Sequence, residues 1–207
     1  MQTVAHIPKS LKTTPITQLE EEGSYELVSL SKLDLLNQQA KYIQIRESLF
    51  FTINLTGSHF EESRIRHARF TNCNFSSVTC EDGSIGNTEF IESRMTGFTV
   101  SDATLEHTLF KNCKLNLANF RFANLKDVLF ENCDIQEADF LGAKLTSVYF
   151  QNCNLTGAQF GRTKLKKTDF RTSIMHGIKI DADAIKGAII SIEQVYDIIG
   201  VLGVEIK

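Results

Sequence analysis

Large apolar residues recur at every fifth position of this chain from about position 45 to position 190. The series includes Ile45, Phe50 and Leu55, is disturbed between residues 78 and 100, and resumes at Leu105. A second column, two positions earlier, holds mostly small residues. A period of five fits neither an α-helix (3.6) nor a β-strand (2.0). The chain therefore contains an internal repeat, and this repeat dictates its architecture.

Both columns must point inward, because only burial explains two such strict series. The residues between them are mostly polar, so a chain that turns a corner every five residues closes a square in about twenty. The predicted core consists of large residues and of the cysteines that precede them by two positions: Phe110, Leu115, Phe120, Leu125, Phe130, Ile135, Phe140, Leu145, Phe150, Leu155, Phe160, Cys113, Cys133 and Cys153.

A twenty-residue period is also present, because Cys113, Cys133 and Cys153 share one register. An asparagine column, which includes Asn112 and Asn132, immediately precedes the cysteines and is interpreted as a turn feature. These periods predict an all-β fold: a right-handed quadrilateral parallel β-helix of about seven coils, each paired to the next at about 4.8 Å.

The repeats also resemble a known family. The triplets Ala118-Asn119-Phe120 and Ala138-Asp139-Phe140 are similar to the A(D/N)(L/F)xx pattern of pentapeptide repeat proteins. The resemblance implies the right-handed quadrilateral β-helix, but it says little about function, since one fold serves many roles.

Residues 78–100 depart from the pattern. Phe98 stands in the column that elsewhere holds small residues, and Cys80 stands in the column that elsewhere holds large apolar residues. We expect either a local bulge or compensation of Phe98 by a smaller neighbour such as Cys80.

Three segments are expected. Residues 1–40 form an N-terminal arm that is partly disordered or capping, residues 41–190 form the β-helix, and residues 191–207 form a helix and a short strand. Ser191 and Gln194 have the spacing of a capping box. The helix carries an apolar stripe at helical spacing, which is the predicted dimer interface: Val195, Ile198, Ile199 and Leu202.

This C-terminal segment resembles that of the Qnr-type quinolone-resistance and albicidin-resistance pentapeptide proteins. The similar stretch runs from Lys186-Gly187-Ala188 to Leu202-Gly203-Val204-Glu205-Ile206. The resemblance implies homodimerisation and binding to DNA gyrase or topoisomerase IV.

Composition argues against several other classes. The net charge of −3 and the pI near 6.0 do not favour direct nucleic-acid binding. No apolar run is long enough to cross a membrane, and five cysteines without a CxxC motif indicate a reduced, cytoplasmic protein. The stacked cysteines have parallel side chains, which cannot build a tetrahedral metal site. No nucleophile–base pair or phosphate loop is visible, so we expect no enzyme activity, cofactor or metal.

Two surface features are candidates for partner binding. Leu109, Leu129 and Tyr149 are spaced by twenty residues and should form an outward apolar stripe, which fits either a partner or the N-terminal arm equally well. The second candidate is an acidic column formed by Glu62, Asp82 and Asp102.

Charge is distributed unevenly along the repeats. Residues 46–140 contain nine basic and fourteen acidic residues, whereas residues 141–190 contain eight basic and three acidic residues. The sequence thus favours a non-catalytic, homodimeric interaction scaffold with an unidentified protein partner. The alternative is a DNA-mimicking protein that binds gyrase or topoisomerase IV and protects it from quinolone-like inhibitors, although the basic segment argues against mimicry along the whole length.

Overall fold

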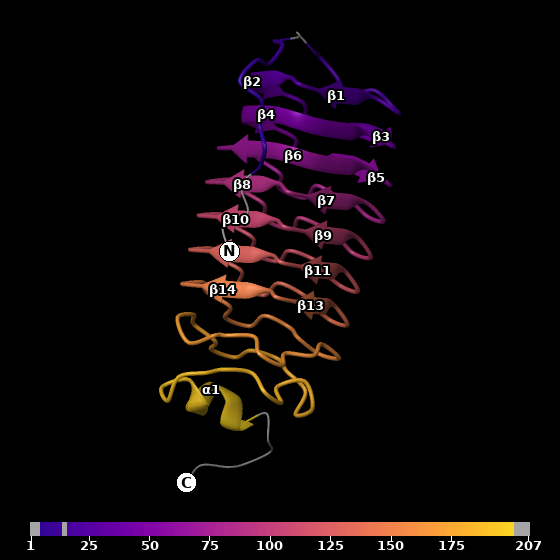
Figure 1. Cartoon of the computed structure of the whole chain (residues 1–207). Helices are drawn as coiled ribbons and strands as arrows, with labels where there is room; N and C mark the ends of the chain where they lie inside the picture. Colours follow the sequence, from indigo (N-terminus) through magenta and orange to yellow (C-terminus); the bar gives the residue numbers. More distant parts are fainter. Residues whose placement is uncertain (1–4, 14–15, 201–207) are drawn as a thin grey trace.

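The chain winds into a column of stacked coils, with the first coil at one end and a short helix at the other (Figure 1). A computed structural model describes residues 5–13 and 16–200. Strand residues pair in parallel with residues twenty positions later, as Phe110 does with Phe130. The predicted fold class, a right-handed quadrilateral parallel β-helix, is confirmed.

We call the four sides of a coil faces A to D in chain order. Faces A and B belong to one large sheet, and the long strands β4 and β6 run across the corner between them. Face A contains β1 (Ser24–Glu26), the first parts of β4 (Gln44–Asn54) and β6 (Arg64–Thr71), β7 (Ser84–Gly86), β9 (Thr104–Glu106), β11 (Asn124–Lys126) and β13 (Lys144–Thr146). Face B contains β2 (Ser29–Asp34), the later parts of β4 and β6, β8 (Glu89–Ile91), β10 (Leu109–Lys111), β12 (Leu129–Glu131) and β14 (Tyr149–Gln151).

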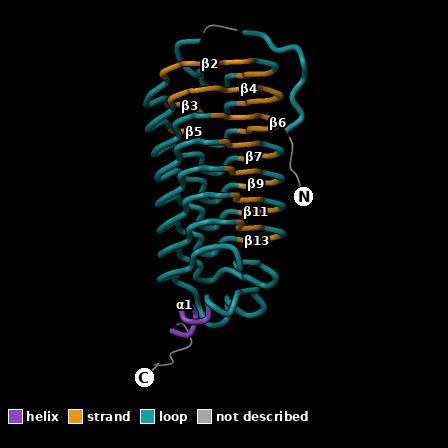
Figure 2. Tube along the Cα trace, turned by 90° about the vertical axis from the view of Figure 1, so that its left-hand side faces the viewer, coloured by secondary structure: helices purple, strands orange, loops and turns teal. Residues whose placement is uncertain are grey.

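Faces C and D pair mainly through single parallel bridges, so most of their length is drawn as loop (Figure 2). Face C runs from the bridge between Asn54 and Asn74 to the bridge between Asn154 and Ile174. Face D begins with the paired strands β3 (Gln39–Lys41) and β5 (His59–Glu61) and continues as bridges to Lys179. Four columns of parallel pairs, five residues apart, make the coil a square.

The corners are made by one left-handed residue in every five. From Glu22 to Lys167, each fifth residue has a positive φ, whether or not it is glycine. This backbone conformation costs an ordinary L-residue about 1–2 kcal/mol, and asparagine tolerates it best after glycine. The asparagine column lies at these corners, with φ of 54° at Asn112 and 52° at Asn132, which confirms the turn interpretation.

The core contains two stacks of phenylalanine rings. One stack runs along face B from Phe50 to Phe170, with ring centroids 4.6–5.6 Å apart. The other runs along face D from Phe120 to Phe160, with separations of 4.7 and 4.8 Å. Rings of the two stacks meet edge to face, as Phe120 and Phe130 do at 5.8 Å and 88°. Both arrangements are favourable for aromatic quadrupoles.

Nearly all of the predicted core residues are buried. Leu145 is the exception, because its side chain is half-buried at the edge of the core, whereas Leu125 and Leu165 on either side of it in face A are fully buried. The buried ones are Phe110, Leu115, Phe120, Leu125, Phe130, Ile135, Phe140, Phe150, Leu155, Phe160, Cys113, Cys133 and Cys153.

The irregular stretch at residues 78–100 is compensated without a bulge. The ladder continues through it, since Thr99 N–H donates to the carbonyl oxygen of Val78 at 2.8 Å and Asn119 N–H donates to that of Phe98 at 2.8 Å. Phe98 is buried and contacts Phe75 edge to face at 6.1 Å. The side chain fits because Cys80 and Val100 occupy face D positions that are phenylalanine in the coils below.

The coils begin about one turn before residue 41, the boundary that the sequence favours. β1 and β2 pair with β4, and Leu30, Leu35 and Ala40 are buried in the five-residue register. Gln38, two positions before Ala40, is half-buried, and its amide oxygen accepts a hydrogen bond from Leu19 N–H at 2.9 Å. The first coil is thus closed by polar contacts as well as by apolar burial.

The C-terminal end is closed by α1 (Val195–Ile199). Its buried Ile198 joins the core, and the Gln194 amide donates to the carbonyl oxygens of Phe170 and Ser173 at 2.7 and 2.6 Å. Ser191 N–H donates to the Gln194 side chain at 2.8 Å, which is one half of the predicted capping box. The predicted strand at residues 204–206 lies outside the described residues. Within residues 5–13 and 16–200, no helix has the length and apolar character needed to cross a membrane.

Candidate protein interaction surface

An apolar stripe follows face B over three successive coils. Leu109 on β10 pairs with Leu129 on β12, and Leu129 pairs with Tyr149 on β14. Leu109 and Leu129 are half-buried and Tyr149 is 43% exposed. The outward alternation of a strand places all three side chains on the surface, one above the other. The structure thus brings together the three residues that the sequence places in one column.

The N-terminal arm lies along the corner between faces A and B above this stripe (Figure 1). Lys12 bridges in parallel to Val28, and the residues that precede Lys12 lead back to the coil of β8. There the buried Ala5 donates its N–H to Glu89 Oε1 at 2.8 Å, while Glu89 Oε2 accepts from Arg69 Nε at 2.6 Å. Glu89 is the residue directly above Leu109 in the ladder. The described part of the arm therefore reaches the coil next to the stripe.

The acidic column lies at the corner between faces D and A. Glu62, Asp82 and Asp102 occupy consecutive left-handed corners, with φ of 47°, 52° and 57°. Glu61 and Glu81 flank this corner; Lys41 Nζ approaches Glu61 Oε2 at 2.6 Å. Successive coils thus present carboxylates at a spacing of about 4.8 Å.

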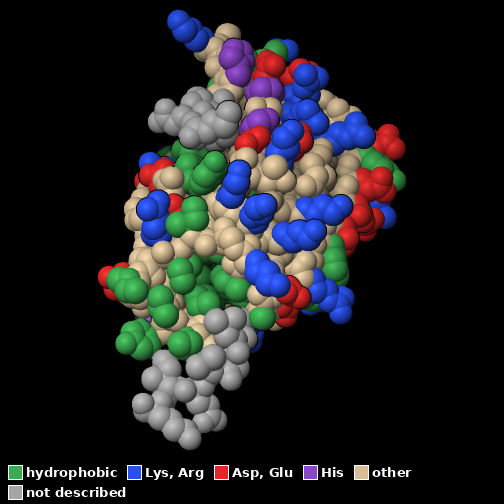
Figure 3. Space-filling view, turned by 60° about the horizontal axis from the view of Figure 1, so that its bottom comes forward, with side chains coloured by type: hydrophobic (Ala, Val, Ile, Leu, Met, Phe, Trp, Pro, Cys, Tyr) green, Lys and Arg blue, Asp and Glu red, His purple; other side chains and the backbone are tan. Residues whose placement is uncertain are grey.

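The same corner changes sign towards the C-terminal end. Below Asp102 it continues through Phe122 and Gly142 to Arg162, which has a φ of 57°. Basic side chains gather on the surface seen from this end (Figure 3). Lys144, Arg162 and Lys164 are exposed and form no ion pair with any described residue. The acidic surface therefore lies in the N-terminal part of the column and the basic surface in its C-terminal part.

The end of the column exposes a third apolar region. Of the predicted dimer residues, Val195 is 37% exposed, Ile199 is half-buried and Ile198 is buried against the core. Leu202 lies outside the described residues. Ile192 and Tyr196 are 78% and 75% exposed. Hydrophobic side chains gather near the C-terminal end of the column (Figure 3). The exposed apolar surface at this end is thus centred on residues 192–196, which run from the turn before α1 into its first residues.

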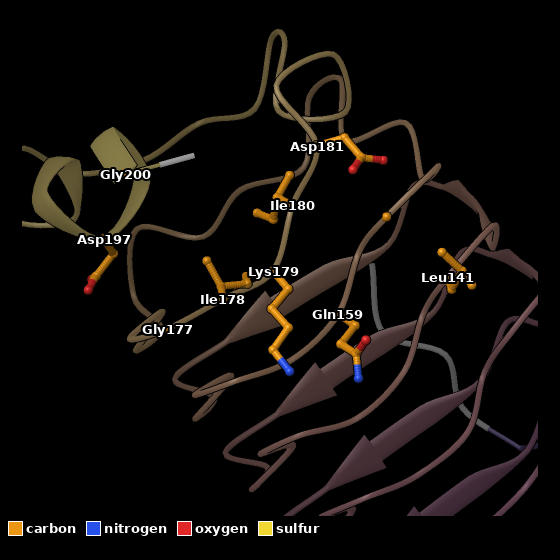
Figure 4. Close-up of a pocket in the computed structure, with 10 residues that line it drawn as sticks. Leu141, Gln159, Gly177, Ile178, Lys179, Ile180, Asp181, Asp197 and Gly200 are labelled. Atoms are coloured by element: carbon orange, nitrogen blue, oxygen red, sulfur yellow. The ribbon is translucent and has the colours of Figure 1, made fainter. Parts of the chain in front are cut away.

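An open hollow of about 540 Å³ separates α1 from face D (Figure 4). Its wall includes Gln159, Lys179 and Asp181 from face D and Asp197 from α1. Asp197 Oδ1 also contacts His176 Nδ1 at 2.7 Å, which joins α1 to the last coils. The lining has no nucleophile paired with a base.

The cysteine column is packed as a set of buried thiols. Cys133 Sγ lies 3.3 Å from the Phe110 carbonyl oxygen, and Cys153 Sγ lies 3.4 Å from that of Phe130. Burial raises the pKa of Cys73 to about 11 and the pKa of Cys80 to about 12. These two thiols are therefore neutral, and a neutral thiol is a poor metal ligand and a poor nucleophile. Among the described residues, no group of three or more His, Cys, Asp or Glu side chains is arranged to hold a metal ion.

Family models match the repeated part of the chain. A model described as "Pentapeptide repeat region" matches residues 63–140 and 84–160, and one described as "Pentapeptide repeats (8 copies)" matches residues 153–177. Together they span residues 63–177, which is more than half of the 207 residues. The chain is a pentapeptide repeat protein.

Two solved structures are similar to this pentapeptide repeat protein at low sequence identity. A trypsin-treated variant of QnrB1, a plasmid-mediated fluoroquinolone resistance protein, is 16% identical and has a TM-score of 0.47, covering 91% of this chain and 99% of that one. HetL, a pentapeptide repeat protein involved in heterocyst differentiation regulation from Nostoc sp. strain PCC 7120, is 17% identical with a TM-score of 0.46, covering 83% and 84%. Comparison with curated proteins gives no significant match.

Sequence reasoning missed two surface features of this pentapeptide repeat protein. The docking of the arm depends on Glu89, which stands at an ordinary outward position and carries no distinguishing signal. The second is Ile192 with Tyr196, which lie outside the helical stripe but are the most exposed large apolar residues at this end. A count of apolar residues on every side of the short helix could have found them.

Proposed function

We propose that this pentapeptide repeat protein is a non-catalytic interaction scaffold of the cytoplasm, which binds a protein partner along Leu109, Leu129 and Tyr149. The observation that carries the proposal is the alignment of these side chains on three paired strands. An ordered row of outward apolar residues on a rigid sheet is a better binding surface than the same residues scattered singly.

The partner test is a pull-down with the purified chain and with a variant carrying Ser at positions 109, 129 and 149. A reproducible partner that the variant no longer retains supports the proposal. The matched control replaces Leu117 and Phe122, which are 57% and 48% exposed on other sides, with Ser. Equal retention by the wild type, the stripe variant and the control contradicts binding along the stripe.

We further propose that the scaffold is a homodimer through its C-terminal end. Support comes from the exposed Val195 and its neighbours Ile192 and Tyr196, and the predicted set also includes Ile198, Ile199 and Leu202. Sedimentation at tens of micromolar should give twice the chain mass of 23.3 kDa. Tyr196→Asp should give the monomer mass, whereas Leu117→Asp should not. A monomeric wild type contradicts the dimer.

A second candidate function is protection of DNA gyrase or topoisomerase IV from quinolone-like inhibitors by mimicry of DNA. The acidic column at Glu62, Asp82 and Asp102 favours it, because duplex DNA presents one negative charge per about 1.7 Å and a paired column presents carboxylates at regular intervals. The test is supercoiling by purified gyrase with a fluoroquinolone, titrated with this protein. Rescue that is lost on changing the three carboxylates to amides supports this role; absence of both rescue and inhibition excludes it.

A further inference from the structure

Among the described residues, the backbone ladder between successive coils is interrupted on faces A and B below β13 and β14. In the regular coils, Asp127 N–H donates to the Thr146 carbonyl oxygen at 2.9 Å, and Tyr149 N–H donates to that of Val128 at 3.0 Å. The equivalent donors one coil later are Ser147 and Asp169. Neither makes a hydrogen bond to any described residue.

The interruption covers both faces A and B. Lys144 N–H donates to Ala123 at 2.9 Å, but Lys164 N–H, one coil below, has no partner among the described residues. β13 and β14 are accordingly the last strands of the large sheet on these faces. Their lower edges, residues 143–151, face residues 162–171 without backbone pairing. We call this interruption the open seam.

The open seam ends at the corner between faces D and A and at the corner between faces B and C. At the first corner, Gly142 N–H donates to the carbonyl oxygen of Gly161 at 2.8 Å, so the backbone ladder is intact there. At the second, Asn152 N–H donates to the Thr172 hydroxyl at 3.1 Å instead of to a backbone carbonyl. Faces C and D stay paired through the bridges from Asn154 to Ile174 and from Gln159 to Lys179. The coil of residues 161–180 is therefore joined to the coil above on faces C and D and unpaired with it on faces A and B.

The core is looser at the seam than above it. The ring centroids of Phe150 and Phe170 are 5.6 Å apart, compared with 5.1 Å between Phe130 and Phe150. Leu145, on the upper edge of the seam, is the half-buried member of the predicted core. Unpaired N–H and C=O groups in this position require a partner from solvent or from another chain.

Two hollows lie side by side along the seam. One, of about 490 Å³, is lined by Lys144 and Leu145 above and by Arg162 and Lys164 below. The other, of about 380 Å³, is lined by residues 149–152 above and by residues 169, 171 and 172 below. The three basic side chains have no ion-pair partner among described residues, whereas Asp169 is already engaged by Arg171 at 2.7 Å. The seam therefore combines free strand edges with uncompensated positive charge.

We propose that the open seam binds an extended acidic segment of a protein partner, which adds as a β-strand to the free edge of residues 143–151. This inference rests on the proposed scaffold function and names the chemistry of the partner. Strand addition supplies the missing backbone hydrogen bonds, and carboxylates on the segment meet Lys144, Arg162 and Lys164. Tyr149 belongs to both the stripe and the seam, so one partner chain can run from one to the other.

Space for the segment comes from the attachment of the last coils. A strand requires a spacing of about 4.8 Å, so the coil of residues 161–180 must tilt away on faces A and B. The paired faces C and D serve as the hinge. Tilting widens the ring contact between Phe150 and Phe170 and breaks the hydrogen bond that the Ser173 hydroxyl donates to the Phe150 carbonyl oxygen at 3.2 Å. Elsewhere in the sheet, entry of a strand would break a continuous ladder.

The test uses fluorescence anisotropy of the full chain with a labelled octapeptide of alternating Glu and Val. We expect saturable binding that weakens with salt. Three probes separate strand pairing from charge attraction alone: the same peptide with N-methylated Val residues, an alternating Lys–Val peptide and an eight-nucleotide oligothymidylate. All three should bind at least tenfold more weakly; equal binding of the N-methylated peptide or the oligonucleotide overturns the proposal.

The variant for the seam carries Lys144→Ser and Lys164→Ser, with an expected loss of at least tenfold in affinity. The matched control carries Lys114→Ser and Lys126→Ser, which remove the same charge from paired coils. Equal affinities of the two variants overturn the proposal. This failure is distinct from failure of the scaffold function, because the pull-down with the Leu109, Leu129 and Tyr149 variant reads out the stripe separately.

Amide hydrogen exchange gives a second measurement that is independent of any variant. The amides of Ser147, Lys164 and Asp169 should exchange rapidly in the free protein and slowly with the Glu–Val peptide, whereas those of Asp127 and Lys144 should be slow throughout. Equal protection of both groups in the free protein shows that the seam is closed and overturns the proposal.

Discussion

The coils of residues 84–151 and the coil of residues 161–180 have the same sequence pattern but differ in how they are held. Within the first group, successive coils are paired with one another on all four faces, and ion pairs such as Lys111–Glu131 at 2.7 Å link them. In the second, faces A and B lack pairing to the coil above, and Asp169 binds Arg171 within its own coil. The difference teaches that large apolar residues at every fifth position are enough for a continuous core. They are not enough to ensure backbone hydrogen bonds between successive coils.

The largest expected effect comes from removing a ring in each region. Phe130 contacts four other rings, including Phe110 at 4.9 Å, whereas Phe170 contacts Phe150 and Phe160 only among described aromatic residues. Phe130→Ala should lower the free energy of unfolding by about 3–5 kcal/mol, and Phe170→Ala by less. Urea denaturation followed by circular dichroism measures both. Equal losses would remove the energetic distinction between the regions.

The next effect concerns the small column in the paired region. Cys133→Phe should cost about 1–3 kcal/mol or more, because the ladder holds the coils at fixed spacing and the neighbouring central residues are large. Phe98 is tolerated only because Cys80 and Val100 make room for it. An unchanged thermal melt contradicts the inward packing of this column.

A smaller effect should follow from closing the seam. Lys164→Glu places a carboxylate below Lys144 and reproduces the arrangement of Lys111 with Glu131. We expect stabilisation by about 0.2–1 kcal/mol and slower exchange of the Ser147 amide. The control is Lys126→Glu, which removes the partner of Glu106 in a paired coil and should not stabilise. A destabilised Lys164→Glu protein would show that the seam is not limited by charge.

The smallest effect is the pH response of the seam. Hydrogen bonds from Arg171 hold the pKa of Asp169 below its ordinary value. A depressed carboxyl pKa stabilises the fold above the unfolded pKa, and this contribution is lost as the pH falls through the folded pKa. Nuclear magnetic resonance titration should therefore show a higher Asp169 pKa in Arg171→Ala than in the wild type. An unchanged value would mean that the two side chains do not pair in solution.

The sequence predicts the core and the corners well, because both repeat every five residues and each has a direct physical cause. Phe130 must be buried, and Asn132 suits a left-handed corner. The sequence does not predict the open seam. Leu145, Phe150 and Phe170 all occupy central positions of the five-residue repeat. The side-chain pattern therefore does not indicate that backbone hydrogen bonds are missing between these coils.

Charge does not reveal the seam either. Lys144 stands above Lys164, but Arg46 also stands above Arg66 and that pair of strands remains joined. Of the candidate surface, the alignment of Leu109, Leu129 and Tyr149 was predictable from spacing alone. The reach of the N-terminal arm was not, because it depends on a single buried contact far along the chain.

That contact also sets an order of events during synthesis. Each coil can add to the one before it as soon as about twenty further residues have left the ribosome. The hydrogen bond from Ala5 to Glu89 spans 84 positions, so the segment around Ala5 must wait for the coil of β8 before it can dock. The arm around Ala5 is thus fastened after the coils that follow it up to β8, and its docking marks the completion of the upper half of the column.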